Sequence, residues 1–401
     1  MRVLVLATDI FTHGGIARYT STLASSLGKM LGPENVDVMC FFDWGYSGQL
    51  ASEFGVIGMV SGDRRAGALS RMRFMFKAAQ AGLRGYDLII ANHIALAPVA
   101  AMMKLVFGTP YWVSCHCVEV WWGTSRWRHA ALKRADLILP VSGYTAEVVR
   151  NMDGVRSSRV KVVYNAIPNS FAELLFRQTP REEIRDCYSR FKPDSKRLLS
   201  VCSLAQKNEF KGVDTVIRAL PRVLNAIPNL GYVVVGDGEL RPKLEKLAIE
   251  VGVQGNVTFV GEITDAELAA LYRGCDVFVL PSRGQERTGI TGGEGFGRVY
   301  LEAAMAAKPV VGSRSGGASE AVLDARTGFV VNPDSSDQVA EALTAILQDP
   351  ELAARMGSAG KAWACDRFSE DALSSSLREL LRPYGFRNEG VQELAHAGGR
   401  P

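Results

Sequence analysis

The sequence predicts an α/β protein made of two doubly wound domains, each built on a parallel sheet. Short apolar runs rich in Val, Ile and Leu alternate with helix-patterned segments along the chain. Strands this apolar are buried on both faces, as in parallel sheets that helices cover. The length of 401 residues exceeds one ordinary core and corresponds to roughly two domains.

In the first half, a strand over residues 2–7 is followed by a loop that contains Gly14-Gly15, and then by a helix over 16–27. This glycine pair permits a close approach to a ligand, although a plain tight turn would use the same residues. It is not the G-x-G-x-x-G fingerprint of a dinucleotide site. Further strands are expected at residues 36–41, 88–91, 111–114, 137–141 and 160–163.

The second half repeats the alternation. Apolar residues at helical spacing predict a helix over 213–227, which ends before Pro228. Other helices are expected over 241–251, 265–274 and 298–308, and a polar loop over 282–292. Strands are expected at residues 197–202, 232–235, 257–260, 276–280, 309–312 and 328–331.

A polar segment between residues 165 and 193, which contains Pro168, Pro180 and Pro193, predicts the hinge between the domains. The N-terminal domain is therefore expected over 1–170 and the C-terminal domain over 171–368, with the cleft between them as the ligand site. A final helix over 369–384 is expected to pack back toward the N-terminal domain. The Gly-rich, charged stretch 385–401 is expected to be disordered.

The composition is that of a folded soluble protein. No apolar run approaches the length of a membrane span, and the strand-like start, interrupted at Asp9, does not match a signal peptide. Seven scattered cysteines indicate a reducing cytosol. Residues 1–180 carry 19 Lys/Arg and 12 Asp/Glu (+7), and the remainder 27 and 30 (−3). The basic half favours an anionic partner, although ordinary surface charge would give the same count.

The stretch Glu294–Glu302 carries most of the chemical information. It follows a predicted strand and opens a helix, a place where open α/β sheets bind ligands. Gly295 and Gly297 let the backbone approach a ligand, and free amides at the helix start favour a phosphate. Carboxylates at Glu294 and Glu302 suit hydroxyl groups. Hydroxyls and phosphates together describe a nucleotide-sugar.

Several motifs in order give a family resemblance that spans about residues 1–370. These are the E-x7-E pair of Glu294 and Glu302, Gly316-Gly317-Ala318-Ser319-Glu320, Lys211-Gly212, Val235-Gly236-Asp237-Gly238 and Gly14-Gly15. The sequence resembles glycosyltransferase family 4, whose GT-B architecture has two Rossmann-like domains facing a cleft, and in particular its bacterial cell-surface polysaccharide enzymes. The resemblance implies retaining transfer of a hexose from a nucleoside diphosphate sugar to a saccharide or lipid-linked saccharide.

The same resemblance implies residue roles on the donor side. Glu294 would hold hydroxyls of the donor sugar, Glu302 those of the ribose, and Lys211 the diphosphate. The loop Gly295-Phe296-Gly297 would carry leaving-group charge. Gly261-Glu262 would surround the nucleobase, and Gly316-Gly317 would present amides to the same pocket.

Two positions depart from the family pattern. Ser203 stands where the family usually has a phosphate-binding Arg, and Lys207 either replaces that charge or is merely solvated. His116 resembles the His that faces the donor sugar, but Cys117 replaces the Gly that often follows it, while Glu119 is in place. A buried structural His is the alternative.

Metal is not expected. If residues 115–117 continue a strand, Cys115 and Cys117 point away from His116 and cannot ligate jointly with it. No Asp-x-Asp pair occurs in the chain, so the resemblance implies metal-independent catalysis, with the nucleotide-sugar as co-substrate and no cofactor.

A Trp- and Arg-rich stretch predicts a surface for a membrane or an acceptor sugar. It contains Trp121, Trp122, Arg126 and Trp127, and an amphipathic basic helix over 64–77 precedes it. Tryptophans in a core are the alternative. The protein is therefore expected in the cytosol or peripherally on the inner face of the membrane, and no nucleic-acid module accompanies the charge.

Two rival functions remain open. Another GT-B enzyme, such as a sugar phosphorylase or a nucleotide-sugar epimerase, would share the fold. A non-catalytic nucleotide-sugar sensor is favoured only by Ser203.

Overall fold

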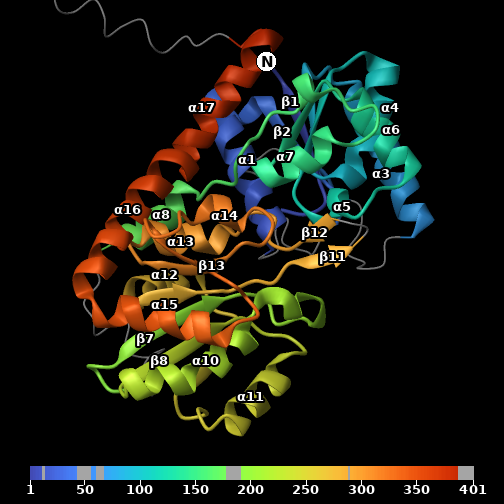
Figure 1. Cartoon of the computed structure of the whole chain (residues 1–401). Coiled ribbons are helices and arrows are strands. Elements are labelled where there is room, and N and C mark those ends of the chain that lie inside the picture. Colours follow the sequence, from blue (N-terminus) through green and yellow to red (C-terminus); the bar gives the residue numbers. More distant parts are fainter. Residues whose placement is uncertain (11–13, 43–55, 60–66, 178–190, 288–289, 387–401) are drawn as a thin grey trace, which may run out of the picture. The chain divides into compact units, whose positions relative to one another are not determined.

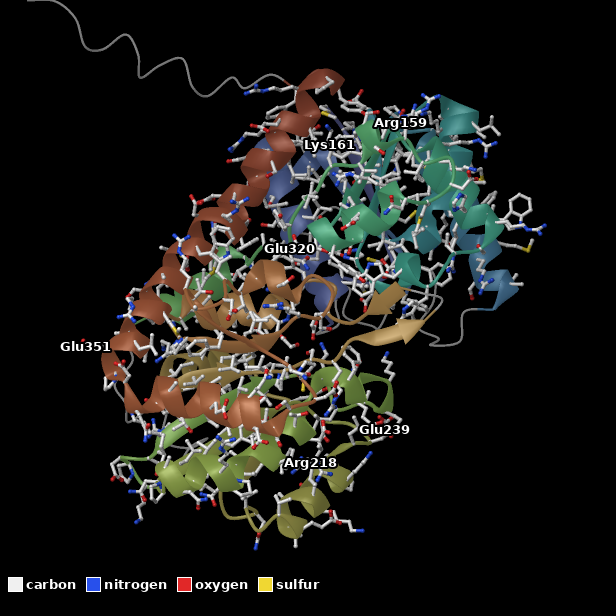
Figure 2. All side chains as sticks on the ribbon, in the orientation of Figure 1. Arg159, Lys161, Arg218, Glu239, Glu320 and Glu351 are labelled. Atoms are coloured by element: carbon white, nitrogen blue, oxygen red, sulfur yellow. The ribbon has the colours of Figure 1, made fainter. Side chains whose placement is uncertain are left out.

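The structure is a computed structural model that describes residues 1–10, 14–42, 56–59, 67–177, 191–287 and 290–386 (Figure 1). It divides into two compact units. The first unit contains Met1–Ser114, Trp127–Ile138 and Asp371–Pro401, and the second contains Cys115–Arg126 and Leu139–Glu370. The domain boundaries expected at residues 170 and 368 stay predictions.

The first sheet is a six-stranded parallel sheet in the order β3-β2-β1-β4-β5-β6. Its central strand β1 is Val-Leu-Val-Leu-Ala with every residue buried, which fits a strand covered on both faces. The strands are β1 (Val3–Ala7), β2 (Val36–Cys40), β3 (Val56–Met59), β4 (Leu88–Ala91), β5 (Tyr111–Cys115) and β6 (Leu137–Pro140).

Helices and single turns lie between these strands and after the last of them. The helices are α1 (Gly15–Leu31), α3 (Ala68–Gly82), α4 (Ala97–Phe107), α5 (Val118–Trp121), α6 (Arg126–Arg134), α7 (Gly143–Arg150) and α8 (Asn169–Phe176). The single turns are η1 (Pro33–Asn35), η2 (Ile94–Leu96) and η3 (Ser157–Arg159).

The second sheet is also six-stranded and parallel, in the order β14-β13-β10-β7-β8-β9. A separate antiparallel pair, β11 (Gln285–Arg287) and β12 (Ile290–Gly292), follows β10. The strands of the sheet are β7 (Lys196–Val201), β8 (Leu230–Val235), β9 (Val257–Gly261), β10 (Val277–Val279), β13 (Val310–Ser313) and β14 (Gly328–Val331).

Among the helices of this region, α10 packs against α11 and α15, α8 packs against α12 and α13, and α16 packs against α13 and α15. In α10, apolar residues recur at helical spacing, and Val213, Val216, Ile217, Leu220 and Val223 are buried. The helices are α10 (Val213–Ala226), α11 (Arg241–Glu250), α12 (Asp265–Gly274), α13 (Arg298–Met305), α14 (Ala318–Ala321), α15 (Ser336–Gln348), α16 (Pro350–Phe368) and α17 (Glu370–Leu381), with the turns η4 (Gln206–Lys211) and η5 (Arg382–Tyr384).

Both sheets have the same doubly wound connectivity. When the strands are numbered within their own sheet, each sheet has the order 3-2-1-4-5-6. Successive strands are therefore added in one direction up to the third strand and in the other direction from the fourth, so the order reverses between the first and fourth strands. This confirms the predicted fold class. Ligands of open α/β sheets bind where that reversal occurs, beyond the carboxyl ends of the two strands. In the second sheet these strands are β7 and β10.

Three sequence expectations need correction. Residues 160–163 form no strand: only Val160 is in an isolated bridge, and the Val163 N–H donates to the Pro140 carbonyl at 2.9 Å. The segment 282–292 is not simply a loop, since it contains β11 and β12; residues 288–289 lie outside the described part. The strand β3 was not expected, and the tail 387–401 also lies outside the described residues.

Among the helices in the described part of the chain, none combines the length and apolar character needed to cross a bilayer.

Candidate functional site

The loops that follow β7 and β10 touch each other at the reversal point of the second sheet. The Arg283 N–H donates to the Phe210 carbonyl at 2.6 Å. Gly212 adopts a φ of +77°, and a Cβ there would lie 2.1 Å from the Pro281 carbonyl oxygen. Glycine is therefore required at this position, and the close approach brings Lys211 next to the segment that follows β10.

Lys211 and Glu294 form an ion pair between Nζ and Oε1, and this pair is the centre of the site. The lysine side chain is 20% exposed and the glutamate side chain 9% exposed, so both charges are largely removed from water. Ser282 Oγ donates to the same carboxylate oxygen at 3.0 Å. Lys211 and Glu294, for which the family resemblance implied binding of the donor diphosphate and the donor sugar, are thus in direct contact.

Burial of Lys211 acts to lower its pKa, because an ammonium group loses hydration there. The charge of Glu294 and the hydrogen bond to it outweigh this effect, and the pKa of Lys211 is raised. Lys211 therefore carries its positive charge at neutral pH, as a phosphate-binding lysine must.

The backbone of Glu294 is held independently of its side chain. Its carbonyl accepts from the Gly317 N–H at 2.8 Å, and its N–H donates to Ser315 Oγ at 3.4 Å. Ser315 Oγ in turn donates to the Arg283 carbonyl at 3.0 Å. The Glu294 side chain can therefore change its partner without moving the loop.

Gly316 and Gly317 are packed against protein atoms. Gly316 has a φ of +56°, and a Cβ there would lie 2.3 Å from the Glu294 carbonyl oxygen and 2.9 Å from the Trp121 ring. A Cβ on Gly317 would lie 2.4 Å from the Gly295 carbonyl oxygen. Since the Gly317 amide already bonds to Glu294, the expectation that both glycines present amides to a ligand is wrong for Gly317.

His116 lies beside the glutamate loop. A Cβ on Gly295 would come within 2.7 Å of the His116 carbonyl oxygen, so glycine allows the two segments to pack. Glu119 folds back and accepts from the His116 N–H at 2.6 Å and the Cys117 N–H at 2.9 Å. His116 itself is 4% exposed. The spacing of His116 and Glu119 therefore serves to fix the backbone at this turn.

The strand argument used against metal needs correction. β5 ends at Cys115, and Cys117 is the N-cap of α5, so side chains no longer alternate as on a strand. Within the described ranges, no three His, Cys, Asp or Glu side chains gather as a metal site.

Glu302 is buried and already holds two donors. Tyr272 Oη donates to Oε2 at 2.8 Å, and Arg298 Nε donates to Oε1 at 2.9 Å. A carboxylate has about four acceptor positions, so Glu302 retains capacity for a hydroxyl group. Its role toward a ribose stays a prediction, and Arg298 and Tyr272 are the residues that would position it.

Phe296 is a core residue. It is 1% exposed and packs against Tyr164 and Phe368, with ring centroids 5.5 and 5.2 Å away. The expectation that Phe296 binds the donor is therefore wrong for its side chain. The glycines on either side place this ring in the core while the loop turns toward the helix start.

Arg283 connects the start of α10 with the segments that follow β10 and β14, and the sequence did not identify it. It forms two hydrogen bonds to Asp214, at 2.9 and 2.7 Å, and one to Asp334 at 2.9 Å. These partners follow β7 and β14, and Arg283 itself follows β10. Ser282 and Ser315 were also missed. Their place two or three residues after the adjacent strands β13 and β10 was the available signal.

The predicted nucleobase side lies at the ends of β8 and β9. Gly261 ends β9 with a φ of +74°, its carbonyl accepts from the Gly236 N–H at 2.8 Å, and Glu262 is exposed. Ser203 and Lys207 are both exposed, with Lys207 on η4. A cavity of about 330 Å³ adjoins η4, with Leu204, Lys211, Val213, Leu240 and Lys243 among its lining residues.

In the first unit, Gly14 is the N-cap of α1 and Gly15 its first residue, and both are exposed. A Cβ on Gly15 would meet nothing within 4 Å. Among the described residues nothing requires a glycine at this position for packing, and the role of Gly14 and Gly15 toward a ligand stays a prediction.

The four aromatic and basic residues of the predicted patch differ in exposure. Trp121 is 1% exposed, and its Nε1 donates to Thr145 Oγ1 at 3.2 Å. The expectation that Trp121 meets a membrane or an acceptor is therefore wrong, because its ring fills the space beside Gly316. Trp122 is partly buried, whereas Arg126 and Trp127 are exposed.

An exposed apolar face occurs instead on α3. Leu69, Met72 and Phe76 are 60, 66 and 65% exposed, although their spacing is that of a buried stripe. Arg71, Arg73 and Lys77 lie on the same helix, which contains no acidic residue. The helix was expected to begin at residue 64, but residues 64–66 lie outside the described part, and α3 begins at Ala68.

The comparisons agree with the fold and the motif order. The model for glycosyl transferases group 1 matches residues 186–363, and the glycosyltransferase family 4 model matches residues 13–171. In the structure of HepE from Anabaena in complex with UDP, 22% identical, the TM-score is 0.78 and the match covers 96% of this chain and 100% of that one. This likeness confirms the GT-B fold.

Two curated relatives are GDP-mannose-dependent α-(1-6)-phosphatidylinositol monomannoside mannosyltransferases. The protein from Mycobacterium tuberculosis is 33% identical over 293 residues, 72% of this chain and 73% of its own. That from Mycolicibacterium smegmatis is 35% identical over 272 residues, 67% of this chain and 69% of its own. The protein is thus a glycosyltransferase with two Rossmann-like domains. More narrowly, the chain belongs to glycosyltransferase family 4.

Proposed function

We propose that this glycosyltransferase moves a hexosyl group from a nucleoside diphosphate sugar to a saccharide or lipid-linked saccharide. The observation that carries the proposal is the Lys211–Glu294 pair at the reversal point of the second sheet. It joins a cation suited to a diphosphate with a carboxylate suited to sugar hydroxyls. A nucleotide-sugar carries both groups a short distance apart.

On the donor, Lys211 binds the diphosphate and Glu294 the hexose hydroxyls. Glu302 accepts from the ribose, and Gly261 and Glu262 lie beside the base. The mannosyltransferase relatives use GDP-mannose by name, which makes GDP-mannose the first donor to test. HepE was crystallised with UDP, so a UDP-sugar is the second.

Transfer proceeds with retention of the anomeric configuration and without a metal ion. The leaving diphosphate is stabilised by Lys211 and by amides near Gly295 and Gly297, and it takes the acceptor proton on the same face of the sugar. His116, held beside Gly295, lies close enough to this loop to orient the hexose. With Ser203 in place of a cation, Lys207 on the exposed turn is the side chain that can supply a further positive charge.

The acceptor is a glycolipid or a saccharide carried on a lipid, and the enzyme meets it at an anionic membrane surface. Two observations support this. The relatives act on phosphatidylinositol mannosides by name, and α3 exposes Leu69, Met72 and Phe76 beside basic residues. Between Gly67 and Arg134 the chain has nine Lys/Arg and two Asp/Glu. Such a surface suits anionic lipid headgroups.

The test has two stages. Thermal unfolding with a panel of GDP-, UDP- and ADP-sugars identifies the donor, because a ligand bound at a hundred times its Kd stabilises by about 2.7 kcal/mol. Transfer is then measured with that donor and glycolipid acceptors, with and without a chelator. Retained configuration and unchanged rates in chelator are expected.

The rivals give different results. Sugar phosphate released on adding inorganic phosphate would indicate a phosphorylase, and epimerised donor without acceptor an epimerase. Donor binding without hydrolysis or transfer would indicate a sensor.

A further inference from the structure

We propose that Glu294 makes the site discriminate between an intact nucleotide-sugar and the nucleoside diphosphate left after transfer. It does so by competing with the diphosphate for Lys211. This inference rests on the proposed function, since it takes Lys211 as the phosphate ligand and Glu294 as the sugar ligand.

The competition follows from the contact between the two side chains. Glu294 Oε1 already occupies the Lys211 ammonium group and also accepts from Ser282 Oγ at 3.0 Å. A phosphate that reaches Lys211 must approach a carboxylate of the same charge sign in a site where neither side chain is more than 20% exposed. Charges so far from water repel more strongly than charges at the surface.

An intact donor offers the displaced Glu294 carboxylate new hydrogen-bond donors, whereas the nucleoside diphosphate product does not. When Glu294 leaves Lys211, its carboxylate needs new donors, because a buried charge without partners is costly. The hydroxyls of the hexose supply these donors. The diphosphate thus replaces Glu294 at Lys211, and the hexose replaces Lys211 at Glu294. A nucleoside diphosphate replaces Glu294 at Lys211 but offers nothing to the displaced carboxylate.

The loop allows this exchange without rearrangement. The backbone of Glu294 is fixed through Ser315 Oγ and the Gly317 N–H, and these bonds do not involve the carboxylate. Only side-chain torsions of Glu294 need to change. Ser282 Oγ donates to Oε1 when the carboxylate is paired with Lys211, so this hydrogen bond favours re-formation of the pair when the product leaves.

Glu294→Gln should strengthen the binding of the nucleoside diphosphate product. This change removes the competing charge while keeping nearly the same shape, so the nucleoside diphosphate should bind about tenfold tighter, or about 1.4 kcal/mol. The matching nucleotide-sugar should bind no tighter, because it loses a charged acceptor for its hydroxyls. The preference of the protein for donor over product should therefore shrink.

The experiment is titration calorimetry with the nucleotide-sugar chosen by the thermal panel and with its diphosphate. Glu294→Asp keeps the charge and should not tighten diphosphate binding, which separates charge from packing. Glu341→Gln removes the same charge from an exposed pair with Arg222 and serves as the control. The effect of Glu294→Gln should persist in 0.5 M salt, because salt screens distant surface charges most.

Equal or weaker diphosphate binding by Glu294→Gln would overturn the inference while leaving the proposed function intact. Equal tightening by Glu294→Asp or Glu341→Gln would also overturn it. If the unaltered protein binds no nucleotide at all, the proposed function fails first, and the inference fails with it.

Discussion

Arg283 and Asp214 form a bidentate pair, with hydrogen bonds of 2.9 and 2.7 Å, across the reversal point of the second sheet. Asp214 is in the first turn of α10, and Arg283 follows β10. The pair therefore joins the start of α10, which follows Lys211, to the segment that leads from β10 toward Glu294. Arg283 thus supports the predicted site although it is not itself a predicted ligand residue.

Arg283→Ala should destabilise the second unit. The charged hydrogen bonds to Asp214 are only partly exposed, so their loss should lower the free energy of unfolding by about 1.5–3 kcal/mol. Urea unfolding measures this change. The matched control is Arg222→Ala, which breaks an exposed pair with Asp337 and Glu341 and should leave the urea midpoint almost unchanged. A similar loss in both variants would contradict the role given to Arg283.

Gly316→Ala should strongly destabilise the folded protein for steric reasons alone. The new Cβ would lie 2.3 Å from the Glu294 carbonyl oxygen, and the φ of +56° disfavours any side chain. Strain and overpacking together should lower stability by about 2–4 kcal/mol. The same substitution at Gly255, where a Cβ meets nothing within 4 Å, is the control. Thermal unfolding compares them, and a Gly316→Ala protein as stable as Gly255→Ala would rule out this packing.

Glu294→Gln should keep the fold and lose most transfer, by about 100-fold or more in kcat, as when one preorganised transition-state contact is removed. The backbone bonds of Glu294 survive the change, so circular dichroism should be unaltered. Steady-state transfer with the identified donor measures the loss. Unchanged turnover would remove Glu294 from the reaction.

Lys211→Met should act mainly on donor binding. It removes the charge that faces the diphosphate, while Ser282 Oγ still donates to the Glu294 carboxylate. The KM for the donor should rise by about tenfold or more, the effect of losing a charge-assisted hydrogen bond. Lys207→Met tests the alternative cation in the same assay. A larger effect at Lys207 than at Lys211 would reverse their assigned roles.

The sequence predicted the framework because it depends on local patterns, and the family resemblance singled out Lys211 and Glu294. Apolar strands and helical spacing identified most elements of the second sheet, and the E-x7-E motif with Lys211 identified two residues that the fold brings into contact. Strand boundaries were correct within about two residues where the run was apolar and bounded by polar residues, as in β8.

What the sequence could not supply was the direction and burial of side chains in irregular segments. Trp121 lies at the end of the short helix α5 and Phe296 in a loop, yet both are buried, because Trp121 packs beside Gly316 and Phe296 packs against the rings of Tyr164 and Phe368. Arg283 was missed for a similar reason. Its partners at 214 and 334 are distant in sequence and meet only because three strands end at one edge.

The α3 face gives the last prediction, on membrane binding. Replacing Leu69, Met72 and Phe76 with serine should weaken binding to anionic vesicles by about tenfold or more, because their exposed apolar surface would enter the headgroup region. Changing Arg71, Arg73 and Lys77 to glutamine should weaken it as well, by about 1 kcal/mol for each charge near the surface. Flotation with anionic and neutral vesicles measures both.

Two controls decide whether that effect belongs to α3. Ile249 is 63% exposed on α11, so Ile249→Ser removes comparable apolar surface from the second unit and should not change vesicle binding. The charge variants should lose their effect on neutral vesicles, whereas the serine variants should not. If the unaltered protein does not bind anionic vesicles, the membrane proposal is wrong. If Ile249→Ser weakens binding equally, the docking surface is not the α3 face.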